Sequence, residues 1–140
     1  MKKEIISAPS AGDPVGPYSQ AVKVGDWIFV SAEKGIDPIT GQIVKGGIRE
    51  QTMQALRNVE AILDAAGSSL IDVVRCVVYM SDTDDFSAMN EAYAEFFPED
   101  QPARSTVIVA RLPLSLLVLV EVTAILGAGK NRSDKLSSGL

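Results

Sequence analysis

Histidine is absent from this chain of 140 residues. Its absence excludes Ser-His-Asp and Cys-His catalysis, zinc sites with histidine ligands, and acid–base catalysis by imidazole. Cysteine is nearly absent as well: Cys76 is the single one, so the chain cannot form an internal disulfide, which fits a reducing cytoplasm. Any catalysis must therefore come from carboxylates, arginine, hydroxyl groups, backbone groups and water.

Positive charge and long apolar runs are also scarce. The chain has 13 Lys and Arg residues against 18 Asp and Glu residues, and the net charge of −5 argues against nonspecific nucleic-acid binding through a broad basic face. The longest apolar candidate, Leu112 to Ile125, is interrupted by Pro113 and Glu121 and is shorter than the ~18 residues of a membrane span. No apolar signal core follows the charged N-terminus. We therefore expect a cytoplasmic protein with no nucleic-acid partner and no membrane partner.

The apolar periodicity predicts one α+β domain over residues 1–127, with a disordered tail over residues 128–140. Two helices are expected to cover one face of a sheet and to leave its other face partly uncovered, which predicts burial against other subunits. The expected elements are a possible short strand at 4–7, a hairpin over 21–32, a helix over 48–66, a strand over 73–80, a helix after Asp82, a strand from Arg104 and a last strand over 116–126.

The second strand of the predicted hairpin follows a two-residue turn, Gly25-Asp26. It is apolar on both faces, so we expect both faces to be covered. Strict alternation assigns Trp27, Phe29 and Ser31 to one face and Ile28, Val30 and Ala32 to the other.

Arg104 lies at the start of a strand, in the stretch Pro102-Ala103-Arg104-Ser105. Its guanidinium offers a planar fork of donors that fits a carboxylate or a phosphate bidentately. A surface ion pair with a nearby carboxylate explains the residue as well. The spacing alone leaves both interpretations open.

Three further polar residues are candidates for a site. Tyr18, held behind Pro17, can cover a pocket or pack on the nearest apolar surface. Asn90, beside the apolar stripe of the second helix, can contact a ligand or bond locally. Glu121 stands alone in an apolar strand and should be hydrogen-bonded, paired or near an interface.

Several short motifs occur together in a fixed order. The motifs are Gly16-Pro17-Tyr18-Ser19-Gln20, Ser31 ahead of Ile36-Asp37-Pro38-Ile39-Thr40-Gly41, Glu50-Gln51-Thr52, Asn58-Val59 before Ala65-Ala66-Gly67, Asn90 with Tyr93 and Phe96-Phe97, and Pro102-Ala103-Arg104-Ser105 with Ala110-Arg111-Leu112-Pro113. In this order they resemble the Rid family (RidA/YjgF reactive intermediate deaminases, also called L-PSP endoribonucleases), over nearly everything from Ala8 to Gly127.

The resemblance implies a chorismate-mutase-like α+β fold, with a mixed sheet and two helices on one face, and a homotrimer with active sites in clefts between subunits. It also implies hydrolysis of 2-imino acids such as 2-iminobutanoate and 2-iminopropanoate, or of their enamine tautomers, to 2-oxo acids and ammonia, without a metal or cofactor. An anionic 2-imino acid suits an arginine fork, and its hydrolysis needs a positioned water and polar groups rather than histidine.

The resemblance also assigns roles by position. Arg104 would clamp the substrate carboxylate, and Tyr18 and Asn90 would line the pocket. Ser31 and the backbone around Ala32 and Thr106 would lie beside the reacting carbon.

The chain departs from the family pattern at three places. Leu119 stands where the last strand usually carries the first of two glutamates, and only the second is present, as Glu121. The usual Ser-Gly-Gln is Ser31-Ala32-Glu33, and Thr106 replaces a common cysteine.

Because Leu119 cannot orient water, two hypotheses stand. One is a deaminase whose water is held by Tyr18, the backbone and Glu33. The other is a trimeric module that binds a small carboxylate through Arg104 without efficient catalysis. The family's older ribonuclease and translation-inhibitor labels fit least, because the chain is acidic and lacks histidine.

Overall fold

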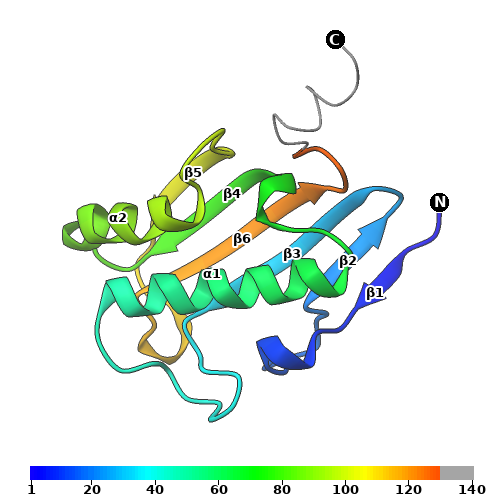
Figure 1. Cartoon of the computed structure of the whole chain (residues 1–140). Helices are drawn as coiled ribbons and strands as arrows, with labels where there is room; N and C mark the ends of the chain where they lie inside the picture. Colours follow the sequence, from blue (N-terminus) through cyan, green and yellow to red (C-terminus); the bar gives the residue numbers. More distant parts are fainter. Residues whose placement is uncertain (130–140) are drawn as a thin grey trace.

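The computed structural model describes residues 1–129, which form one α+β domain (Figure 1). The predicted tail falls on residues 128–140, of which only the first two are described. Ala128 donates its backbone N–H to the carbonyl of Ile125 at 2.9 Å, and Gly129 donates its N–H to the carboxylate of Asp72 at 2.9 Å. These two bonds attach the end of the described chain to the domain. The rest of the predicted tail lies outside the described residues.

Six strands form one sheet in the order β1-β2-β3-β6-β4-β5. The pair β4 and β5 is parallel and every other pair is antiparallel, so the predicted mixed sheet is confirmed. The strands are β1 (Glu4–Ile6), β2 (Ala21–Val24), β3 (Trp27–Lys34), β4 (Val73–Met80), β5 (Ala103–Ile108) and β6 (Val118–Ile125). The helices are α1 (Ile48–Ala65) and α2 (Phe86–Phe96), with single 3₁₀ turns at Pro9–Ala11, Leu70–Asp72, Thr83–Asp85 and Pro113–Ser115.

Both helices cover the same face of the sheet, as the sequence predicts (Figure 1). α1 begins after Gly47, whose backbone N–H donates to the Glu50 carboxylate at 2.8 Å, and the chain leaves the helix through Gly67 at φ +81°. The core lies between α1 and the sheet, where fully buried side chains include Leu56, Ile62, Ile28 and Val120. No helix within residues 1–129 has the length and the apolar character that crossing a membrane requires.

Within residues 1–129 no helix lies on the opposite face of the sheet (Figure 1). Trp27 and Phe29 lie there with 46% and 47% of their surfaces exposed, and their rings stack at 6.1 Å between centroids. Alternation along β6 adds Leu119, Glu121 and Ile125 to the same face, whereas the intervening residues are buried under α1. The described part of the chain therefore leaves this apolar face open, as predicted, and it does not provide the double coverage expected for β3.

A β-bulge interrupts β3. Its register with β6 shifts between Val30 and Glu33, so two consecutive residues, Ser31 and Ala32, both line a cavity on the helix-free side. Glu33 takes the next buried position after Val30. The prediction that Ala32 shares a face with Ile28 and Val30 is therefore wrong, because the extra residue of the bulge inverts the alternation from that point.

Candidate functional site

The residues predicted for the site fall into two groups on opposite faces of the sheet. The first, called here the arginine group, lies on the helix-covered face between β5 and α2 and consists of Arg104, Asn90, Tyr93 and Phe86. The second lines a cavity on the helix-free side, called here the apolar pocket. Its lining residues are Val15, Tyr18, Ser31, Ala32, Lys34, Pro113, Leu114, Leu116, Leu119 and Glu121.

Arg104 is held by an amide and by aromatic rings. Its Nη2 donates to Oδ1 of Asn90 at 2.7 Å, and its guanidinium carbon lies 4.6 Å from the ring centroid of Tyr93 and 6.0 Å from that of Phe86. Within residues 1–129 the salt bridge found joins Arg49 to Glu95, so no described carboxylate neutralises Arg104. The guanidinium is thus oriented, half-buried and left with donors for an anion, and the ion-pair interpretation finds no partner among the described residues.

The groups beneath Arg104 are not charged at neutral pH. Burial raises the pKa of the Cys76 thiol to about 11, although the charges of Arg104 and Arg75 oppose this shift. Burial also raises the pKa of the Tyr93 hydroxyl. Cys76 is fully buried, and a protonated thiol at this depth is a poor nucleophile. The chemistry of this group therefore belongs to Arg104 and Asn90.

Thr106 follows Arg104 at the next position on the same face of β5, paired with Val78 of β4. It is half-buried, and its backbone continues the strand that carries the guanidinium. Thr106 therefore belongs beside the arginine group and not in the apolar pocket.

The apolar pocket has a volume of about 470 Å³ and few polar groups. Ser31 donates its hydroxyl to the carbonyl of Ser19 at 2.7 Å, and Tyr18 accepts a hydrogen bond from Lys34 Nζ at 3.2 Å. The Tyr18 hydroxyl also accepts the N–H of Val15 at 3.3 Å. Tyr18, Ser31, Ala32 and Leu119 thus line one cavity, whose walls are mainly apolar.

Glu121 is the carboxylate of the apolar pocket. The Tyr79 hydroxyl donates a hydrogen bond to Glu121, and this bond raises the pKa of Tyr79. Glu121 was expected to be hydrogen-bonded, paired or near an interface, and the first of these alternatives is found. Glu121 was not among the residues predicted for the site, although the alternation of β6 places it on the same face as Leu119.

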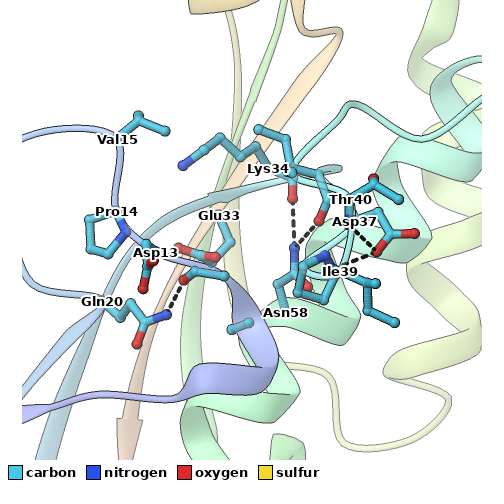
Figure 2. Close-up of a pocket in the computed structure, with 15 residues that line it drawn as sticks. Asp13, Pro14, Val15, Gln20, Glu33, Lys34, Asp37, Ile39, Thr40 and Asn58 are labelled. Atoms are coloured by element: carbon cyan, nitrogen blue, oxygen red, sulfur yellow. Dashed lines mark hydrogen bonds between the residues drawn. The ribbon is translucent and has the colours of Figure 1, made fainter.

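Glu33 lies apart from both groups. It lines a second cavity of about 310 Å³, with Asn58 of α1 and the loops 11–15 and 36–41 (Figure 2). Only 5% of its surface is exposed, and burial raises its pKa from the ordinary 4.5 to about 7, with the charge of Lys34 opposing. The structure does not bring Glu33 together with Tyr18 and Ser31, so a water held jointly by these three side chains does not fit one chain.

Replacing Glu33 by glutamine is expected to remove a fall in stability between pH 5 and pH 8. The folded protein holds the Glu33 proton up to about pH 7, whereas an unfolded chain releases it near pH 4.5, so stability falls as the pH rises through this window. The fall is at most about 2–3 kcal/mol. Denaturant unfolding of Glu33→Gln and the parent at both pH values measures it, with Glu60→Gln on the exposed side of α1 as control. If Glu33→Gln changes the free energy of unfolding by the same amount at pH 5 and at pH 8, the raised pKa of Glu33 is contradicted.

The mixed six-stranded sheet, the two helices on one face and the arginine presented on an edge strand define the class of RidA-like α+β proteins. The family model described as Endoribonuclease L-PSP matches residues 7–126. This chain belongs to the Rid family, as its motifs predict.

Known relatives agree with this assignment. A RutC family protein of Pyrococcus abyssi is 52% identical over 124 residues, which cover 89% of this chain and 98% of that protein. The human protein named 2-iminobutanoate/2-iminopropanoate deaminase is 42% identical over 89% of this chain and 91% of its own length. The crystal structure of RidA from an Antarctic Psychrobacter is similar at a TM-score of 0.85 and 39% identity, covering 88% of this chain and 99% of that one.

Proposed function

We propose that this protein hydrolyses reactive 2-imino acids, or their enamine tautomers, to 2-oxo acids and ammonia. The observation that carries the proposal is Arg104, a guanidinium oriented by Asn90 and Tyr93 with no carboxylate partner among the described residues. A 2-imino acid carries one carboxylate, which the free edge of such a guanidinium binds bidentately. The deaminase names of relatives about 43% identical, from goat and house dust mite, support this reaction class.

The reaction itself makes modest demands on the protein. Water adds to C2 of the imine, the nitrogen gains a proton, and the resulting carbinolamine loses ammonia to leave the C2 carbonyl. The oxidation state of C2 does not change, so no oxidant is consumed. The carboxylate clamp fixes C2 in place, and the lone pairs of Ser31 and the Tyr18 hydroxyl are suited to orient the water and the departing amine.

We infer that the complete site forms between two copies of the chain. The arginine group and the apolar pocket lie on opposite faces of one sheet, so a single chain cannot close both around one small molecule. A second copy that sets its apolar pocket against the arginine group would complete the site. Such an interface joins two different patches and is therefore heterologous, and a heterologous interface whose rotation closes gives a ring rather than a two-fold dimer. The open face around Trp27 and Phe29 also favours association, and we propose a homotrimer.

The assembly predicts a mass of three times the chain's 14.9 kDa by light scattering at micromolar concentration. It also predicts complementation between two inactive variants, Arg104→Ala and Leu119→Trp, the second of which fills the apolar pocket. After joint refolding at equal amounts, random assortment leaves about a quarter of the clefts with both halves intact, and activity returns to about that fraction of the parent. A monomer, or inactive mixed trimers, would contradict a site shared between subunits.

A second candidate function is favoured by Leu119. This side chain occupies the pocket where a water-orienting carboxylate is usual in the family, and Glu121 is already engaged by Tyr79. A trimer that binds a small 2-oxo or 2-imino acid through Arg104 without turning it over fits these facts. Binding of 2-oxobutyrate without acceleration of imine hydrolysis would favour this candidate over the deaminase.

A further inference from the structure

The carboxyl group of Glu33 lines a cavity and has no protein partner among residues 1–129 (Figure 2). The two amide side chains that line the cavity, Gln20 and Asn58, already form hydrogen bonds with other groups. Gln20 accepts the N–H of Ala8 at 2.6 Å and donates to the carbonyls of Ala8 and Gly12. Asn58 donates to the carbonyls of Lys34 and Ile36, each at 3.0 Å, and accepts from Gln54 at 2.9 Å.

Among residues 1–129 no hydrogen bond or salt bridge reaches the Glu33 carboxyl, although the side chain is 95% removed from solvent. Glu33 lines the cavity, so the partner that its carboxyl lacks within residues 1–129 can be a molecule bound there. The cavity in front of it holds about 310 Å³, enough for a small guest. The Glu33 carboxyl can thus accept a hydrogen bond from a small molecule bound in this cavity.

The charges around this cavity favour a cation. Asp13 and Asp37 line it together with Glu33, and Lys34 is the basic residue of the lining. Lys34 directs its Nζ to the Tyr18 hydroxyl at 3.2 Å and lies 5.8 Å from the Tyr18 ring centroid, so it does not pair with Glu33. The α1 helix adds only the neutral Asn58. A guest that balances this set must be positively charged and must donate hydrogen bonds.

We propose that the Glu33 cavity is a binding site for a small ammonium cation, either NH₄⁺ or a primary alkylammonium. A metal ion fits less well, because residues 1–129 contain no group of three or more acidic, Cys or His side chains placed to hold one. An ammonium group offers several N–H donors and a single charge, which matches one buried carboxylate. The proposal stands without the proposed deaminase activity, although ammonia is one product of that reaction.

The site gives ammonium binding a pH dependence. The pKa of Glu33 is about 7 because burial disfavours its charged form, so the carboxylate that binds a cation is mainly present above neutrality. The charge of Lys34 opposes this rise of the pKa, and Asp13 and Asp37 are the other charged side chains that line the cavity. Because only the ionised fraction binds, the apparent affinity for methylammonium should rise about tenfold between pH 6 and pH 8.

The test is a titration of the full chain with methylammonium chloride at pH 8 and constant ionic strength, followed by amide chemical shifts in NMR. We expect saturable shifts confined to residues 11–15 and 33–41 in the parent and in Glu60→Gln. Glu33→Gln keeps the shape and removes the charge, and its affinity should be at least tenfold weaker. Equal binding by Glu33→Gln, or no saturable shift in the parent, would overturn the proposal.

Salt controls on the unaltered protein make the test independent of any variant. Ammonium chloride should give the same localised shifts, whereas tetramethylammonium, which has no N–H donor, should not. Potassium has a similar size to ammonium but, like tetramethylammonium, has no N–H donor, so it should bind more weakly than ammonium. Potassium or tetramethylammonium binding as tightly as methylammonium would contradict a site that selects for N–H donors.

Discussion

Leu119→Glu is expected to raise the rate of 2-iminobutyrate hydrolysis while leaving the affinity for 2-oxobutyrate nearly unchanged. Leu119 lines the apolar pocket, opposite Tyr79 in the pairing of β4 with β6, and a carboxylate there can orient the attacking water. Assistance of this kind is typically worth about 10²–10⁴-fold and acts mainly in the transition state. The Arg104 clamp, in contrast, holds substrate and product alike. Steady-state rates and product binding by calorimetry therefore separate the two contributions.

The control for this change is Thr123→Glu, which adds a carboxylate to the same face of β6 outside the pocket lining. Folding and assembly must be checked for both variants, because each new charge lies two residues from Glu121. A folded Leu119→Glu assembly that is no faster than the parent would contradict the importance of this position. If both variants hydrolyse 2-iminobutyrate faster than the parent, the position of the added carboxylate on β6 does not matter.

Arg104→Lys is expected to weaken 2-oxobutyrate binding by about 10- to 150-fold. Lysine keeps the charge but loses the bidentate fork and the stacking on Tyr93, and a charge-assisted pair in a partly buried cleft is worth about 1.5–3 kcal/mol. Calorimetric titration measures the loss. Arg75→Lys is the matched control, because Arg75 is exposed on the neighbouring strand and donates to Ser105 at 2.9 Å. If Arg104→Lys binds as tightly as Arg75→Lys, then Arg104 is not the clamp.

The elements that the sequence predicts well are those with local signals. The Gly25-Asp26 turn places Val24 opposite Trp27, and Gly67 stops α1 in the left-handed conformation that glycine adopts freely. Residues 73–80 form a strand with the predicted bounds. The bulge in β3 has no comparable signal. It arises where β3 pairs with β6, almost ninety residues later, and it decides that Glu33 is buried and that Ala32 lines the apolar pocket.

The candidate site also combines features with local sequence signals and features that depend on distant parts of the chain. Alternation along β6 is enough to place Leu119 and Glu121 on one face, and the start of β5 is enough to present Arg104. The partners of these residues are not local. Tyr79 reaches Glu121 because β4 pairs with β6, and Asn90 reaches Arg104 because α2 packs over the β5 edge. That the arginine group and the apolar pocket occupy opposite faces depends on the sheet order as a whole, which periodicity alone does not determine.

The most direct test of the proposed function is the release of 2-oxobutyrate and ammonia from freshly generated 2-iminobutyrate. The parent protein is predicted to accelerate both above the spontaneous rate, in equal amounts, and Arg104→Ala is predicted to return both to the spontaneous rate. A parent protein that forms the expected assembly and binds 2-oxobutyrate through Arg104, yet leaves the progress curve identical to the protein-free reaction, would contradict the deaminase function.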